Sequence, residues 1–79
     1  MEPRRNHFLR IYNEDRQVIY EEPFWSASNA QREFNDTVYD LTRDLECGKV
    51  LYVTRWEGKF LAESNKVVGN GKVNERKGA

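Results

Sequence analysis

The sequence is poor in residues that cross-link a small chain or build a metal site. Cys47 is the only cysteine among its 79 residues, so no disulfide can form within the chain. An unpaired thiol is typical of a reducing compartment, and we therefore expect a cytoplasmic location. His7 is the only histidine, and no cysteine or carboxylate near it has the spacing of a metal site. We expect neither a metal nor any other cofactor.

Long apolar runs and an excess of one charge are also absent. No stretch approaches the roughly 18 apolar residues of a membrane-spanning helix, and the first ten residues lack the apolar segment of a signal peptide. We therefore expect no membrane association. Lysine plus arginine and aspartate plus glutamate both number 13, so the net charge is zero. A neutral total argues against binding nucleic acid with the whole surface, although it leaves room for a local basic patch.

The sequence also lacks the residue motifs of common catalytic sites. Ser26 and Ser28 have no histidine partner in a nucleophile motif, and no phosphate-binding glycine motif precedes a helix. Cys47 lies at the expected C-terminal end of a helix, where the helix dipole disfavours a thiolate. We therefore expect a protein that is not an enzyme.

One amphipathic helix is predicted between Ser28 and Gly48. Ser28 and Gln31 have the spacing of a capping box, and Gly48 supplies a residue suited to the left-handed conformation that ends helices. Apolar residues recur every three or four positions between these signals, which places them on one face. This stripe consists of Ala30, Phe34, Val38, Leu41 and Leu45.

Two hairpins flank this helix. The first pairs residues 8–12 with 17–22, and the second pairs residues 50–56 with 59–64 across a turn at Glu57 and Gly58. The order β-β-α-β-β predicts an α+β fold, a four-stranded, mainly antiparallel sheet with the helix packed on one face. A crossover through the helix would also allow the first and third strands to be parallel neighbours.

The domain is expected to span residues 1–64, with residues 1–6 loose. Residues 65–79 combine lysines, an arginine and glycines and are expected to form a flexible basic tail, with a short extra strand at 66–68 as an alternative.

The alternation of the strands assigns residues to two sheet faces. With Tyr12 opposite Gln17 and Trp56 opposite Lys59, the helix would cover Leu51, Val53, Phe60 and Ala62. The opposite face would then be unusually apolar for a solvated surface, so we expect it to be covered. A homodimer, a tail strand, a partner protein and stacked nucleic-acid bases are the alternatives. This face comprises Phe8, Arg10, Tyr12, Ile19, Tyr52, Thr54, Trp56 and Leu61.

The helix has a second distinctive surface, an acidic outer strip. Such a strip is commonly just solvated, but it can also imitate a phosphate track and dock in a basic groove of a nucleic-acid-handling enzyme. The strip comprises Glu33, Asp36, Asp40, Asp44 and Glu46.

The layout resembles that of small phage-encoded inhibitors of bacterial defence, the anti-CRISPR proteins in particular. The resemblance lies in the stretch 26–31 that opens the helix and in the hairpin 50–63 with its charged ends, within a compact chain that has no enzyme motif. It implies stoichiometric occlusion of a partner in the host cytoplasm, without turnover.

We therefore predict a non-enzymatic binding module that docks on a nucleic-acid-handling protein complex. Nucleic-acid or nucleotide binding through an aromatic and basic sheet face is the alternative. The predicted partner-binding residues are Arg10, Tyr12, Tyr52 and Trp56 on the sheet and Asp36, Asp40 and Asp44 on the helix.

Overall fold

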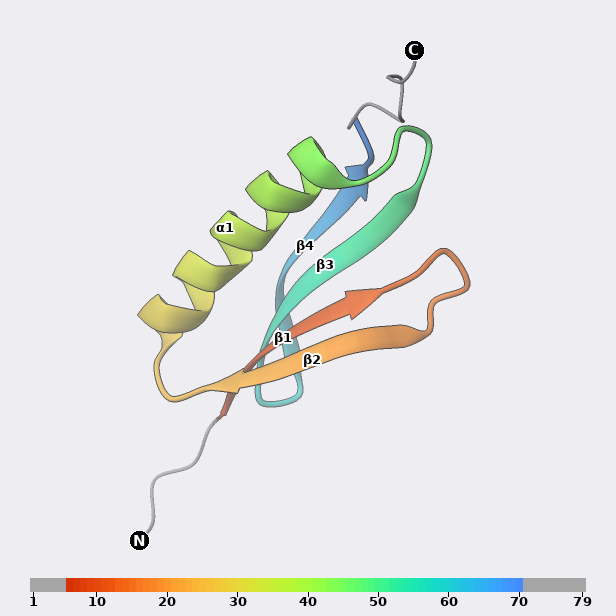
Figure 1. Cartoon of the computed structure of the whole chain (residues 1–79). Coiled ribbons are helices and arrows are strands. Elements are labelled where there is room, and N and C mark those ends of the chain that lie inside the picture. The colour runs from red at the N-terminus through yellow and green to blue at the C-terminus, as the bar shows by residue number, and fades with distance from the viewer. Residues whose placement is uncertain (1–5, 71–79) are drawn as a thin grey trace, which may run out of the picture.

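The computed structural model describes residues 6–70 as an open four-stranded sheet with one helix across one face (Figure 1). The predicted α+β class and the order β-β-α-β-β are confirmed. The predictions for residues 1–5 and 71–79 lie outside the described residues. The elements are β1 (His7–Tyr12), β2 (Val18–Phe24), α1 (Ala27–Asp44), β3 (Val50–Glu57) and β4 (Phe60–Val68).

The strand order in the sheet is β2-β1-β3-β4, and every neighbouring pair is antiparallel. The expectation that the first and third strands are parallel neighbours is wrong, because β1 and β3 pair antiparallel. The strands that run parallel are β2 and β3, and β1 lies between them. The connection through α1 therefore passes over β1, which places the helix above the middle of the sheet.

The helix begins two residues earlier than the sequence predicts. Ser26, not Ser28, is the N-cap: its backbone is extended, and its Oγ accepts a hydrogen bond from the Asn29 N–H at 3.2 Å. The expected capping box is absent because Ser28 already lies inside the first turn. The amide of Gln31 instead donates to Glu63 Oε1 at 2.8 Å, which links α1 to β4. Gly48 has a φ of 90° in the turn that follows the helix.

The apolar stripe of α1 faces the sheet as predicted. Ala30 and Phe34 are buried, and Val38, Leu41 and Leu45 are partly buried against the core. The sheet side of this core consists of Leu9, Ile11, Val53 and Val67.

The second hairpin has a different register from the predicted one. Glu57 pairs with Phe60 and Trp56 with Leu61, so Gly58 and Lys59 form the turn and the opposition of Trp56 and Lys59 is wrong. Gly58 has a φ of 61°, the conformation that glycine adopts most readily, and its N–H donates to the Asn6 carbonyl at 2.7 Å.

This register changes the composition of the core. Phe60 is 78% exposed and Ala62 is exposed at an irregularity of the strand pairing, so the prediction that they pack under the helix is wrong. Val67, which pairs with Leu51 near the other end of the hairpin, is 2% exposed and belongs to the core instead. The domain boundary expected after Ser64 is therefore too early, because β4 continues to Val68.

The first hairpin also differs by one position. Tyr12 pairs with Val18 rather than with Gln17, and a register shift follows Ile11, which pairs with Tyr20. Val18 therefore lies on the same sheet face as Tyr12.

Among residues 6–70, no helix combines the length and the apolar character that crossing a bilayer requires.

Candidate functional site

The sheet face opposite α1, here called the reverse face, carries the candidate site. No described element covers it, because the one helix of residues 6–70 packs on the other face. Arg10, Tyr12, Tyr52 and Trp56, four of the predicted partner-binding residues, lie together on it. Cross-strand partners form its rows, which are Pro23–Phe8–Trp56–Leu61, Glu21–Arg10–Thr54–Ser64 and Val18–Tyr12–Tyr52–Lys66.

Arg10 lies at the centre of the reverse face in several fixed contacts. Its Nε donates to Glu21 Oε2 at 2.9 Å, and its guanidinium carbon lies 5.4 Å from the centroid of the Phe8 ring and 5.2 Å from that of Trp56. Burial lowers the pKa of Arg10, but the hydrogen bond and charge of Glu21 outweigh that effect and raise it. Arg10 is therefore held in place with a carboxylate close to its charge.

Thr54 orients the indole of Trp56. The threonine is 6% exposed; its Oγ1 donates to the Arg10 carbonyl at 2.9 Å and accepts from Trp56 Nε1 at 2.8 Å. Both hydrogen bonds satisfy the buried hydroxyl of Thr54, once as a donor and once as an acceptor. The hydroxyl therefore fixes one edge of the Trp56 ring on the reverse face.

Arg16 enters the site from the turn between β1 and β2. Its guanidinium carbon lies 4.5 Å from the centroid of the Tyr52 ring, a cation–π distance. The turn is closed by a hydrogen bond from the Arg16 N–H to the Asn13 carbonyl at 3.0 Å, and Arg16 itself has a φ of 66°. Hairpin loops of this kind usually place glycine at such a left-handed position.

A depression of about 280 Å³ lies between these side chains. Sequence reasoning missed two of its charged neighbours, Arg16 and Lys66. Arg16 lies between the two strands predicted for the first hairpin, and Lys66 lies in the predicted tail, at the start of the alternative strand 66–68; in the structure Lys66 belongs to β4 and pairs with Tyr52. Residues 63–66 are all polar, so no apolar alternation indicated that the strand continues to Val67. The depression is lined by Tyr12, Arg16, Tyr52, Thr54, Trp56, Leu61 and Ser64.

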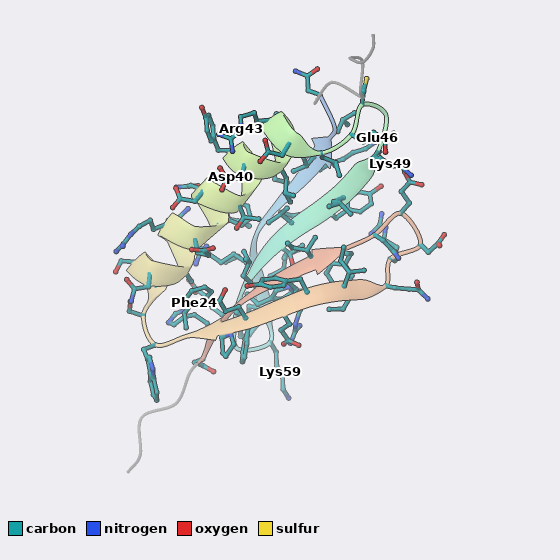
Figure 2. The ribbon with its side chains drawn as sticks, in the orientation of Figure 1. Phe24, Asp40, Arg43, Glu46, Lys49 and Lys59 are labelled. Carbon is teal, nitrogen blue, oxygen red and sulfur yellow. The ribbon has the colours of Figure 1, made fainter. Side chains whose placement is uncertain are left out.

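The acidic residues predicted for partner binding lie elsewhere. Asp36, Asp40 and Asp44 are exposed on α1, on the other side of the sheet from the reverse face. Arg43 contacts two of them, with Nη2 at 3.5 Å from Asp40 Oδ1 and Nε at 2.8 Å from Asp44 Oδ1 (Figure 2). The hydrogen bond and charge of Arg43 lower the pKa of Asp44. The predicted set therefore divides into two separate surfaces.

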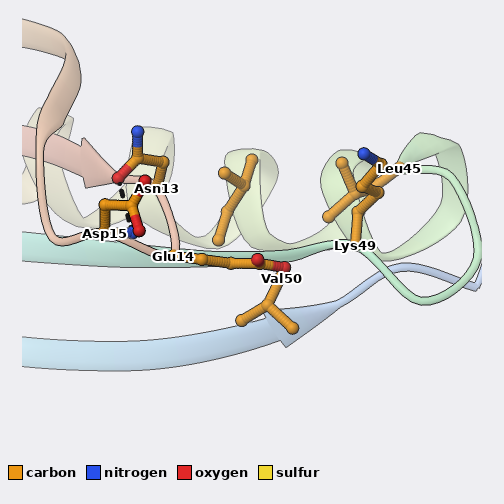
Figure 3. Close-up of a pocket in the computed structure, with 7 residues that line it drawn as sticks. Asn13, Glu14, Asp15, Leu45, Lys49 and Val50 are labelled. Atoms are coloured by element: carbon orange, nitrogen blue, oxygen red, sulfur yellow. Dashed lines mark hydrogen bonds between the residues drawn. The ribbon is translucent and has the colours of Figure 1, made fainter.

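A second hollow, of about 250 Å³, lies between the turn of the first hairpin and the end of α1 (Figure 3). Asn13 Oδ1 accepts from the N–H groups of Asp15 at 2.8 Å and Gln17 at 3.0 Å, so this side chain shapes the turn. Glu14 and Asp15 lie beside it, but residues 6–70 contain no group of three side chains suited to a metal ion. We assign no site to this hollow.

The helix side of the sheet holds an unexpected buried charge. Arg55 is 8% exposed; its Nε donates to Glu63 Oε1 at 3.0 Å and its Nη1 to Glu57 Oε2 at 3.1 Å. Burial lowers the pKa of Arg55, but these two carboxylates outweigh that effect and raise it. Because Gln31 donates to the same Glu63 oxygen, the network joins the start of α1 to both strands of the second hairpin and has a structural role.

Comparison with known proteins assigns no family to this geometry. No protein-family model, no curated protein and no solved structure matches the chain significantly.

Proposed function

We propose that this protein is a non-enzymatic binding module that docks on another protein through its reverse face. The observation that carries the proposal is a sheet face, covered by no element of residues 6–70, on which aromatic rings and guanidinium groups surround a depression. Tyrosine, tryptophan and arginine are the residue types most enriched among the hot spots of protein interfaces. Tyr12, Tyr52 and Trp56 are the proposed apolar anchors, and Arg10 orients the partner.

The anchors are ordered before any partner arrives. Trp56 is held by Thr54 and by the guanidinium of Arg10, and Arg10 is held in turn by Glu21. Immobilising a flexible side chain on association costs roughly 0.5–1.5 kcal/mol, so contacts that already exist reduce the cost of binding. This preorganisation supports a docking role for the reverse face.

We extend the proposal to the kind of partner suggested by the resemblance to anti-CRISPR proteins. In this form the protein is a phage-type inhibitor that occludes a nucleic-acid-handling complex of a bacterial cell, without turnover. The exposed carboxylates Asp36, Asp40 and Asp44 support it, because they offer a second, acidic surface. Since they lie across the sheet from the reverse face, they would contact a different part of such a complex.

Affinity capture from bacterial lysate, with and without nuclease, tests the proposal. The tagged protein is compared with Trp56→Ala and with Tyr39→Ala, which removes a ring that is 66% exposed on α1. We expect a nuclease-resistant protein partner that Trp56→Ala loses and Tyr39→Ala retains. Equal capture by both folded variants would contradict docking through the reverse face. A purified dimer that Trp56→Ala dissociates would instead show a homodimer across that face.

Nucleic-acid binding is the second candidate, and one observation favours it. Arg16 and Lys66 flank Tyr52, and neither has a carboxylate partner within residues 6–70. Aromatic rings beside cations are common in proteins that bind single strands. Phosphate contacts weaken steeply as salt rises, whereas an apolar protein interface weakens much less. If no single-stranded oligonucleotide is retarded at low salt, this candidate is excluded.

A further inference from the structure

We propose that the occupant of the reverse face is an acidic peptide segment, with carboxylates on Arg16 and Lys66 and one bulky apolar side chain in the depression. The inference rests on the proposed docking function and names the chemistry of its partner. It follows from the charge balance of the face, from the guanidinium groups that lie on its rings, from the backbone conformation of Arg16 and from the size of the depression.

The charge balance of the reverse face is positive. Its rows contain Arg10 and Lys66 against a single acid, Glu21, and Arg16 reaches the face from the adjoining turn. Glu21 lies 2.9 Å from Arg10, so that pair is matched. Within residues 6–70, Arg16 and Lys66 have no ion pair, and both lie next to Tyr52. A complementary partner is therefore anionic at this point.

The rings on this face favour a carboxylate over a nucleic-acid base. A base would stack on a free ring, but three of the four rings in these rows already carry a guanidinium, since Arg10 lies over Phe8 and Trp56 and Arg16 lies over Tyr52. A guanidinium that lies on a ring still presents N–H donors in its own plane, in the fork that matches a carboxylate. A carboxylate therefore binds Arg16 without displacing it from Tyr52.

The backbone of Arg16 is a second, independent indication. Its φ of 66° lies in the left-handed region, which costs roughly 1–2 kcal/mol for a residue with a side chain. Glycine would form the same turn without that cost. Strained residues of this kind cluster at ligand-binding positions, because the side chain is needed where it is placed.

The depression has room for one bulky side chain. Its volume of about 280 Å³ lies near the lower end of the range of roughly 300–1,000 Å³ that is common for pockets of drug-sized ligands. Tyr12, Tyr52, Trp56 and Leu61 supply its apolar lining, and Arg16 lies among them. One apolar residue flanked by aspartates or glutamates satisfies both features.

Selection from a random peptide display library on the immobilised full chain tests this inference. The enriched sequence is then synthesised with a fluorescein label, together with a form in which every Asp and Glu becomes Asn and Gln. An oligothymidylate of equal length serves as the nucleic-acid probe. Binding of each probe is measured by fluorescence anisotropy at low and moderate salt.

We expect enriched peptides in which acidic residues flank a bulky apolar residue. Loss of one charge-assisted contact should weaken binding about tenfold, so we expect that effect for Arg16→Gln and for Lys66→Gln. The amide form of the peptide should bind weakly, and Arg32→Gln, an exposed change on α1, should have no effect.

Several results would contradict the proposal of an acidic peptide. Enrichment of peptides without acidic residues, no enrichment at all, or tighter binding of the oligothymidylate each overturns the inference. If Trp56→Ala still abolishes capture of a lysate protein, the docking function stands while its acidic ligand is wrong. If neither experiment depends on the reverse face, both proposals fail.

Discussion

The guanidinium carbon of Arg16 lies 4.5 Å from the centroid of the Tyr52 ring, and this contact joins the turn of the first hairpin to a central strand of the sheet. Arg16 makes this contact from a left-handed backbone, with a φ of 66°. A residue that is unfavourable for its turn therefore provides one of the two cations of the candidate site that have no ion pair within residues 6–70.

Two substitutions at Arg16 distinguish the cost of its left-handed backbone from the stabilisation that its contact with Tyr52 provides. Arg16→Ala loses the cation–π contact and keeps the left-handed strain, and we expect it to lower the free energy of unfolding by about 0.5–1 kcal/mol. Arg16→Gly loses the same contact but relieves strain of roughly 1 kcal/mol, so its stability should stay near that of the parent chain. Urea denaturation checks the order. An alanine variant as stable as the glycine variant would contradict the strain assignment.

The position of the helix N-cap makes a second prediction. Ser26→Ala removes the side-chain acceptor of the Asn29 N–H, and we expect a loss of about 1 kcal/mol in the free energy of unfolding. Ser28→Ala changes an exposed residue inside the first turn and should cost less than about 0.5 kcal/mol. Thermal and urea unfolding of the two variants should give this order, and the reverse order would restore Ser28 as the cap.

The extension of β4 into the predicted tail makes a third prediction. Val67→Ala deletes buried apolar groups and should cost about 2 kcal/mol, from the lost transfer free energy and the cavity that remains. Phe60→Ala removes a larger side chain, but that side chain is 78% exposed. We therefore expect a change within about 0.5 kcal/mol for Phe60→Ala. Chemical denaturation distinguishes this core from the predicted one, in which Phe60→Ala would be the costlier change.

The buried Arg55 network makes a fourth prediction. Arg55→Ala leaves Glu57 and Glu63 without their cation and removes a side chain that is 9% exposed. We expect a loss of about 2 kcal/mol, less than for a fully buried pair, because both carboxylates keep access to water. Arg43→Ala breaks ion pairs of a side chain that is 58% exposed and should leave the free energy of unfolding nearly unchanged. Equal losses in urea denaturation would show that Arg55 contributes no more than a surface charge.

The pH dependence of stability is predicted at Tyr20. Its hydroxyl donates to Glu22 Oε1 at 2.6 Å, and this hydrogen bond raises the pKa of Tyr20 in the folded chain. The unfolded chain then releases the proton at lower pH, near the ordinary value of about 10, so the stability contributed by Tyr20 falls as the pH rises above that value. Unfolding midpoints at alkaline pH should therefore decline less in Tyr20→Phe. The same decline in both chains would exclude this contribution.

The helix and the strands were predictable because their signals are local. The apolar stripe of α1 repeats at the helical period, and its first and last members face the core as expected. The order of the strands along the chain followed in the same way from short runs of alternating residues. Such patterns need no knowledge of what lies across the sheet.

The pairing register of the strands and the sheet face of each residue were harder to predict from the sequence. The partner of Trp56 is Leu61, two positions beyond the predicted Lys59, so Phe60 keeps its predicted side of the sheet but lies opposite Glu57 at the end of the hairpin, where it is 78% exposed. The irregularity between Arg55 and Trp56 leaves Ala62 without a partner and shifts the alternation of β4 by one position. Val67 rather than Lys66 therefore lies opposite Leu51.

The candidate site likewise combines features that the sequence predicts with relationships that it does not. The sequence by itself determined that a helix with one apolar face lies between two hairpins, since periodicity and turn residues act within a few positions of the chain. Only the tertiary structure decided that Arg16 lies on Tyr52, that Lys66 stands beside them and that the aspartates of α1 lie on the other side. These relationships depend on strand order and register, which are determined by packing between segments distant in sequence.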